Sequence, residues 1–317
     1  MQTTVSLGID IGGTNIAFGI IDKNGNCLAD GSLPTTAYNT PQDFVLDLHK
    51  TVNKELSKLE VKLIGIGVGA PNGNYFNGTI ENAANLKWKG TIPMVELLVK
   101  QFGVPSFITN DAKAAAIGEM IYGGAKGMKD FVIITLGTGL GSGIVVNGKL
   151  VYGHDGLAGE VGHTLVCGGD RYCNCGRRGC LETYASATGI KRTACELLAL
   201  ENTPSALRDI PYTEITAKKV YDAAQKGDPI ALEAFKITGE QLGKALANLV
   251  AIISPEAIFL QGGVANAGEW LFKTTQEQME ANMLYVFKQK VKILRSSLPT
   301  NAAIFGASAL VWNELNA

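Results

Sequence analysis

Apolar residues along the chain fall into two patterns, short continuous runs and longer stretches with helical spacing. The runs within residues 5–22 and 131–152 each enter and leave a turn of glycine and threonine, so each predicts a β-hairpin. Buried strands are also predicted at 62–69 and 257–260. Helical spacing predicts four main helices, over residues 40–59, 185–200, 216–226 and 229–253. Strands and helices interleaved in this way indicate an α/β fold.

The two hairpins repeat one arrangement about 125 residues apart. The first turn reads Asp10-Ile-Gly12-Gly13-Thr14, and the second contains Gly137-Thr138-Gly139. Glycines let backbone N–H groups crowd around an anion, and a threonine hydroxyl adds a donor. A single Gly-Gly turn is more often only a turn, but its repetition favours two related lobes that face one nucleotide.

Two further segments carry candidate chemistry. A short strand is expected to end at Thr109, and Asn110-Asp111 then opens an alanine-rich helix. Asp111 is placed either to cap that helix or to accept a hydroxyl proton during phosphoryl transfer. After the strand at 257–260, Gly262-Gly263 forms a third glycine turn, at which adenine or ribose can lie against bare backbone.

Residues 160–182 contain a cluster of metal-ligand type. We interpret it as a structural zinc site with four ligands, His163, Cys173, Cys175 and Cys180. Cys167 competes with His163 for the fourth place, and a disulfide with a spare thiol is the alternative to zinc. A nucleic-acid-binding zinc ribbon would need paired C-x₂-C knuckles and a basic face, which this segment lacks. Glu160 and Glu182 are not needed as ligands and are free to face a polar substrate.

Composition narrows the classes of partner. The 317 residues are 46% hydrophobic and 18% charged, as in an ordinary globular protein. With 28 basic and 29 acidic residues, the chain is not expected to bind nucleic acid or an anionic membrane by electrostatic attraction. The first residues lack the features of a secretory signal, and the apolar run at 245–253 is too short to span a bilayer. A cytoplasmic location is therefore expected.

Taken together, these motifs resemble the ROK family of sugar kinases and related repressors. The resemblance covers essentially the whole chain and is most specific in Cys173-x-Cys175-Gly-x-x-Gly-Cys180-x-Glu182. It implies the two-lobed α/β fold of actin-like ATPases (ribonuclease H-like), with an interlobe cleft. The smaller lobe would comprise residues 1–111, completed by a C-terminal helix within 301–317, and the larger lobe 112–300. The family also implies a homodimer.

The resemblance further implies an ATP- and Mg²⁺-dependent kinase that acts on a hexose. Asp111 would be the general base toward the 6-hydroxyl. The sugar site would comprise Gly69, Asn85, Asn110, Glu160, His163 and Glu182, and His163 would bind zinc with its other ring nitrogen. Asp10 would orient Mg²⁺ or its water. Phosphates would lie on the turns of Gly12, Gly13 and Thr14 and of Gly137, Thr138 and Gly139, and adenosine on Gly262 and Gly263.

Glucose is the expected sugar, because the loop from Asn82 to Trp88 and the set Glu160, His163 and Glu182 look glucokinase-like. Mannose, fructose, allose and N-acetylated hexosamines remain alternatives. A sugar-responsive repressor of the same family is a second interpretation, but the first phosphate loop begins at residue 10 and leaves no room for an N-terminal helix-turn-helix. An actin-like ATPase with a protein client is a third, and the zinc motif argues against it.

Overall fold

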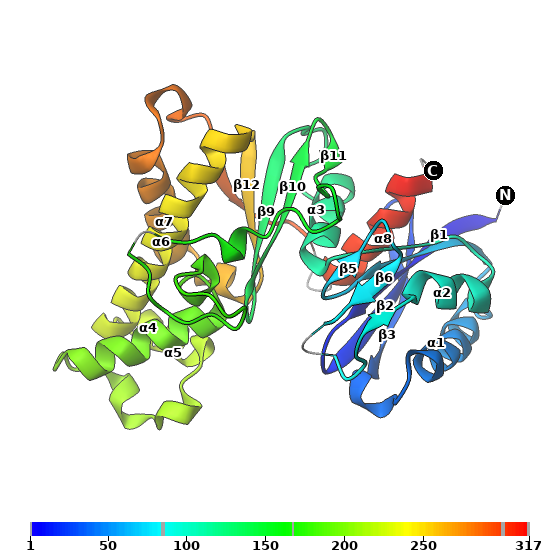
Figure 1. Cartoon of the computed structure of the whole chain (residues 1–317), viewed down its shortest axis with the longest axis horizontal. Coiled ribbons are helices and arrows are strands. Elements are labelled where there is room, and N and C mark those ends of the chain that lie inside the picture. The colour runs from blue at the N-terminus through cyan, green and yellow to red at the C-terminus, as the bar shows by residue number, and fades with distance from the viewer. Residues whose placement is uncertain (1, 84–85, 167, 299–301, 316–317) are drawn as a thin grey trace.

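The computed structural model describes residues 2–83, 86–166, 168–298 and 302–315, and contains two five-stranded sheets with the same plan (Figure 1). The first sheet has the order β3 (Cys27–Pro34), β2 (Asn15–Asp22), β1 (Thr3–Ile11), β4 (Val61–Gly69) and β8 (Ser106–Thr109). The second has the order β11 (Lys149–Leu150), β10 (Leu140–Val146), β9 (Phe131–Leu136), β12 (Ala257–Gln261) and β13 (Lys292–Arg295). In each, an antiparallel meander of three strands is followed by two parallel strands. The predicted repeat of two related halves is confirmed.

The first sheet packs against two helices on one face, α1 (Pro41–Leu56) and α2 (Met94–Phe102), over a core that includes Phe44 and Leu48. Helix α1 begins as predicted, because the Thr40 side chain accepts from the Asp43 amide at 3.1 Å and Pro41 follows the cap. The sequence interpretation missed α2. Short antiparallel strands β5 (Gly73–Asn74), β6 (Thr79–Glu81) and β7 (Thr91–Ile92) lie nearby.

The second half contains α4 (Ala187–Leu200), α5 (Ala217–Gln225), α6 (Pro229–Ile253) and α7 (Glu269–Asn282), which share one hydrophobic core with the second sheet; α4 and α5 pack on α6. The helices predicted over 185–200, 216–226 and 229–253 are confirmed to within two residues. Helix α7 was not predicted, because its buried side chains are few: Leu271, Thr275 and Met279. Short 3-10 helices complete the description: η1 (Thr35–Ala37), η2 (Val161–His163), η3 (Leu181–Thr183), η4 (Ala206–Asp209), η5 (Tyr212–Glu214), η6 (Gly263–Ala267) and η7 (Tyr285–Phe287).

Two helices join the halves, α8 (Ala302–Leu315) against the first sheet and α3 (Asp111–Ile121) against the second. Glycines allow the close contacts. A side chain at Gly67 would overlap the Ala307 carbonyl of α8, and a Cβ at Gly143 would lie 2.5 Å from that of Ala116 in α3. The helices also pack on each other, and α3 therefore begins between the two sheets.

None of the helices in the described part of the chain combines the length and apolar character needed to cross a bilayer.

Candidate active site

A cleft of about 900 Å³ lies where the two halves meet. Asp10 lines it from the first sheet, and Asn110 and Asp111 line it from the start of α3. The second half contributes the turn Gly137–Gly139, the carboxylates of Glu160 and Glu182, and Gly262 and Gly263. The structure thus brings together predicted residues that are up to 253 positions apart in the sequence, in a volume suited to a small-molecule site.

Parallel pairing of β1, β4 and β8 places the first carboxylates. Asp10 pairs with Gly69, and Gly69 pairs with Thr109, so the three strands end together. Helix α3 begins two residues after Thr109 and carries Asp111 to the same edge. Gly69 is buried below this edge, where a Cβ would lie 3.6 Å from the Asp111 Cα, and it does not line the cleft.

The capping role considered for Asp111 is filled by Asn110. The Asn110 side chain is the N-cap and accepts from the Ala112 amide at 3.0 Å. Asp111 is the first residue of α3, and its Oδ1 accepts from the same amide at 2.8 Å. Asp111 therefore adds little as a cap and is open to the cleft.

Both carboxyls at this edge hold protons more tightly than usual. Burial within the surrounding protein, and then the negative charge of Asp111, raise the pKa of Asp10 to about 6. Although Asp111 is open to solvent inside the cleft, protein encloses it on most sides, and this desolvation raises its pKa against the opposing effect of the Ala112 amide. Perturbed carboxyls that converge in a cleft are typical of functional sites.

The two phosphate-type turns differ in their position relative to the cleft. The first turn is held by Thr35, whose hydroxyl donates to the Gly12 carbonyl at 2.7 Å, and Gly12, Gly13 and Thr14 do not line the cleft. In the second turn, Gly137 and Thr138 are exposed within it. The Gly12 amide donates to Asn15 and the Gly137 amide to Gly139, both at 3.0 Å. Of the four glycine amides predicted to bind phosphate, those of Gly13 and Gly139 are left to do so.

The third glycine turn has a backbone that only glycine adopts readily. Gly262 has a φ of +99°, and a Cβ there would lie 2.5 Å from the Leu136 carbonyl oxygen. Arg295 in β13 holds the turn by donating from Nη2 to the Ala265 carbonyl at 2.8 Å. The sequence interpretation did not nominate the cleft-lining residues Gln261, Asn266, Arg295 and Ser296. Gln261 and Asn266 flank the predicted glycine turn, whereas no motif marks Arg295 and Ser296, which the pairing of β12 with β13 brings beside it.

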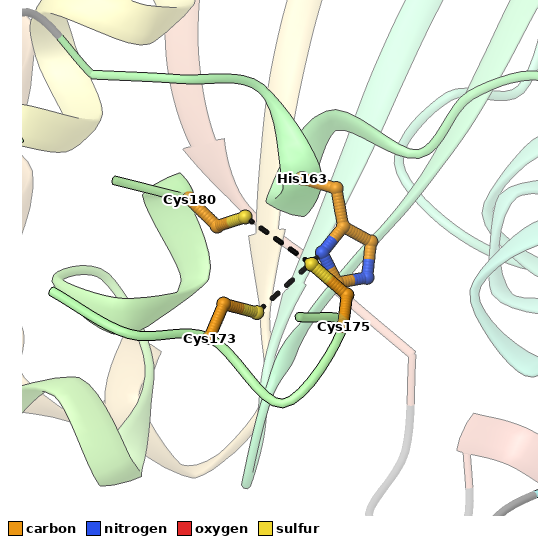
Figure 2. Close-up of side chains that lie close together, drawn as sticks. All are labelled: His163, Cys173, Cys175 and Cys180. Carbon is orange, nitrogen blue, oxygen red and sulfur yellow. Dashed lines mark hydrogen bonds between the residues drawn. The ribbon is translucent and has the colours of Figure 1, made fainter. Parts of the chain in front are cut away.

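The predicted zinc ligands converge (Figure 2). The ligand atoms of His163, Cys173, Cys175 and Cys180 all lie within 4.8 Å of one another. The Cys173 sulfur is 3.8 Å from His163 Nδ1, and the Cys175 and Cys180 sulfurs are 3.6 Å apart. Thiolates about 2.3 Å from a tetrahedral zinc ion are about 3.8 Å from each other, whereas a disulfide requires about 2 Å. The cluster fits zinc and contains no disulfide.

Cys167, the alternative fourth ligand, and Asn85, a predicted sugar ligand, both lie outside the described residues.

Glu182 connects the zinc cluster to the second phosphate turn. Its Oε1 accepts from the Cys173 thiol at 3.4 Å, and its Oε2 accepts from the Leu140 amide at 3.1 Å. Glu160 directly precedes η2, which ends at His163, and Glu182 follows Cys180 by two residues. Both predicted sugar carboxylates therefore lie close in sequence to a candidate metal ligand. A zinc ion here would therefore fix the position of two groups that face the cleft.

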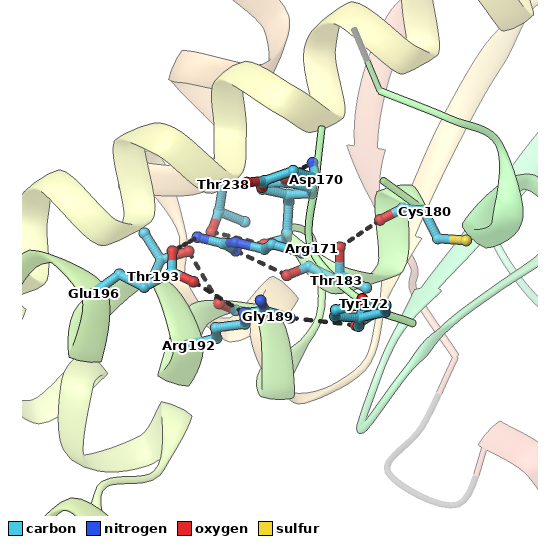
Figure 3. Close-up of polar contacts among 11 residues, drawn as sticks. Asp170, Arg171, Tyr172, Cys180, Thr183, Gly189, Arg192, Thr193, Glu196 and Thr238 are labelled. Carbon is cyan, nitrogen blue, oxygen red and sulfur yellow. Dashed lines mark hydrogen bonds and ion pairs between the residues drawn. The ribbon is translucent and has the colours of Figure 1, made fainter. Parts of the chain in front are cut away.

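A buried arginine holds the segment of the candidate zinc ligands against α4 (Figure 3). Arg171 donates to the Thr183 carbonyl at 2.8 Å and pairs with Glu196 of α4 at 2.5 Å. Its guanidinium also lies 4.1 Å from the centre of the Tyr184 ring. These contacts link Cys173 and Glu182 to a rigid helix.

Comparison with known proteins shows which sequences and folds this chain resembles. The model of the ROK family matches residues 6–314. A glucokinase of Halalkalibacterium halodurans is 36% identical over 316 residues, which cover 98% of this chain and 96% of that protein. A xylose repressor of Caldicellulosiruptor bescii is 30% identical over 86% of this chain and 68% of that protein.

Among solved structures, a ROK family glucokinase from Streptomyces griseus in complex with glucose and AMPPNP has a TM-score of 0.79. Its sequence is 32% identical, with 96% of this chain and 98% of that chain covered. The expected fold is therefore confirmed. Because the family model spans nearly all of the sequence and full-length relatives exceed 30% identity, this chain belongs to the ROK family.

Proposed function

We propose that this protein is an ATP-dependent hexose kinase that phosphorylates glucose at the 6-hydroxyl. The observation that carries the proposal is one cleft in which Asp111 lies with two glycine turns and three further carboxylates, those of Asp10, Glu160 and Glu182. The similarity to glucokinases over nearly the full length supports glucose as the sugar.

Asp111 is the proposed general base. Burial raises the pKa of Asp111 and so makes its carboxylate a stronger base. The carboxylate can then take the proton of the 6-hydroxyl as the phosphoryl group transfers. The Ala112 amide holds its Oδ1 in place. Asn110, Glu160, His163 and Glu182 would bind the other hydroxyls, and Asn85 and Gly69 stay predictions of the family resemblance. Holding the acceptor in one geometry supplies much of the rate enhancement in such reactions.

The nucleotide would bind along the glycine turns, with phosphates on Gly13, Thr14, Thr138 and Gly139 and adenosine against Gly262 and Gly263. Gly12 and Gly137 would shape the turns through their own hydrogen bonds. Asp10 and Asp111 together suit a divalent cation, since Mg²⁺ prefers carboxylate oxygens. Asp10 would hold Mg²⁺ or its water, and the ion would neutralise charge on the phosphates.

The division of the chain into lobes is part of the proposal. We assign residues 1–111 and the C-terminal helix within 301–317 to the smaller lobe, and 112–300 to the larger one. Two separate hydrophobic cores and the packing of α8 on the first sheet support this division. A homodimer and a cytoplasmic location are further expectations, the latter because thiolate ligands for zinc require reduced cysteines.

A sugar sensor without kinase activity is the alternative from the sequence, and a xylose repressor is among the similar proteins. ADP release with Mg-ATP separates the two when measured with glucose, mannose, fructose, allose, N-acetylglucosamine and N-acetylmannosamine. A kinase will show strong stimulation by one sugar, whereas binding of a sugar without turnover would indicate the sensor.

The role of Asp111 is tested by Asp111→Asn. The variant should fold, because Asn110 caps α3 independently, and it should bind ATP and glucose. Its kcat should fall by about 10²- to 10⁴-fold. Asp209→Asn, at an exposed aspartate of η4, is the matched control and should keep wild-type turnover. Near-normal kcat in Asp111→Asn would remove the base from the mechanism.

A further inference from the structure

A lysine side chain is buried beside the catalytic edge. Lys113 lies in the first turn of α3, two residues after Asp111, and only 2% of it is exposed. Its neighbours Ala112 and Ala116 pack against glycines of β10. A buried ammonium costs several kcal/mol unless its partners compensate, so packing alone does not explain a lysine at this position.

The partner of Lys113 is a loop of the second half. Its Nζ donates to the Gly156 carbonyl at 2.7 Å. Burial lowers the pKa of Lys113, and the negative charges of Glu160 and Asp155, on the same loop, act in the opposite direction. The ammonium therefore interacts with this loop through both a hydrogen bond and charge.

The loop over residues 153–160 depends on such bonds for its shape, because it contains neither helix nor strand. Three elements hold three of its carbonyls. Asn74 of β5 donates to the Asp155 carbonyl at 3.0 Å, Lys113 of α3 to the next carbonyl, and the Ser142 hydroxyl of β10 to that of Gly159. The loop then ends at Glu160, which lines the cleft.

The backbone of the loop leaves little freedom at the point that Lys113 holds. Gly156 is buried with a φ of +86°, and a Cβ there would lie 2.9 Å from Asn74 Oδ1. Without Lys113, the carbonyl of the buried Gly156, four residues before Glu160, would lose this hydrogen-bond donor. The carboxylate of Glu160 would then lose its fixed position.

We propose that Lys113 is a positioning residue of the sugar site, which holds the loop 153–160 so that Glu160 faces the sugar. Lys113 does not line the cleft and so acts through the loop. Because Asp111 and Lys113 share one helical turn, the same element presents the base and anchors the loop of the sugar carboxylate. This inference rests on the proposed kinase function, in which Glu160 binds sugar hydroxyls.

The test is Lys113→Met, which keeps the apolar stem and removes the ammonium. KM for glucose should rise about 10- to 100-fold, with KM for ATP and kcat within about twofold of wild type. Calorimetry with glucose alone should show the same loss of affinity. Thermal stability should change little, because removal of the buried charge offsets the loss of a donor to the Gly156 carbonyl. Lys126→Met, at an exposed lysine, controls for the loss of one charge and should match wild type.

Several outcomes would overturn the inference. An active wild-type enzyme with unchanged glucose affinity in Lys113→Met refutes the role of Lys113 alone, and so does lower stability with unchanged affinity. A wild-type protein that phosphorylates no sugar refutes the proposed function instead. If Lys113→Met does not fold, the glucose affinity of Lys113→Gln decides in the same way.

Discussion

Replacing Asp10 by asparagine should make the protein more stable at neutral pH while impairing catalysis. Asp10 lies at the end of β1 in the cleft, and its pKa of about 6 arises from burial and then from the charge of Asp111. Asparagine has nearly the same shape and no charge. The substitution therefore removes an ionised group that the fold holds at a cost.

The sign and size of the effect follow from linkage. The pKa is about 6 in the folded protein and 3.8 ordinarily, so the folded state binds the proton more tightly. Ionisation of Asp10 then costs stability as the pH rises from about 4 to about 6, and the cost is constant above that range. At about 1.4 kcal/mol for each tenfold change in proton affinity, the limit is about 3 kcal/mol. Water in the cleft reduces it, and we expect about 2 kcal/mol.

The assay is urea denaturation of wild type and Asp10→Asn from pH 4 to pH 8 without nucleotide or Mg²⁺. The variant should match wild type near pH 4 and exceed it by about 2 kcal/mol at pH 7.5. Mg-ATP should then stabilise wild type more than the variant, and the variant's kcat/KM for ATP should fall. A stability difference that does not change with pH would refute the reasoning, because the ionisation of Asp10, and through its charge that of Asp111, is what distinguishes the two proteins.

Three further predictions concern the zinc site and the glycine turns. Cys175→Ser should lose bound zinc, measured by elemental analysis, and raise KM for glucose, since the cluster holds Glu182 and His163; a metal-free variant with unchanged KM would contradict this. Gly139→Ala should raise KM for glucose, because the new methyl group overlaps Glu182 Oε2, and unchanged glucose kinetics would argue against it. Gly262→Ala should lower stability by about 1 to 3 kcal/mol, measured by denaturation, whereas Gly263→Ala, which meets no atom within 4 Å, should not.

The sequence predicts those parts of the fold in which local pattern and burial agree. Helix α6 begins and ends at the predicted residues, because Asp228 caps it before Pro229 and its apolar face is continuous. Strand β3 was missed because all of its residues are exposed or half-buried, so no apolar run marks it. The motifs located the glycine turns, Asp111 and the zinc ligands. They did not reveal Lys113 or Arg295, because the carbonyls to which these side chains donate lie 43 and 30 residues away in the sequence, respectively.

The stretch between β11 and α4 has little regular structure, and this explains why the site combines a cluster of candidate metal ligands with a buried lysine. This stretch holds Glu160, His163 and Glu182, yet its regular structure in the described residues is limited to η2, η3 and two isolated bridges. A loop of this length has too few backbone ladders and too little buried apolar surface to fix side chains by itself. Zinc would tie its second part, Arg171 secures that part to α4, and Lys113 holds the first part to α3. Because α3 also carries Asp111, the proposed base and the anchor of the loop that ends at Glu160 belong to one helix.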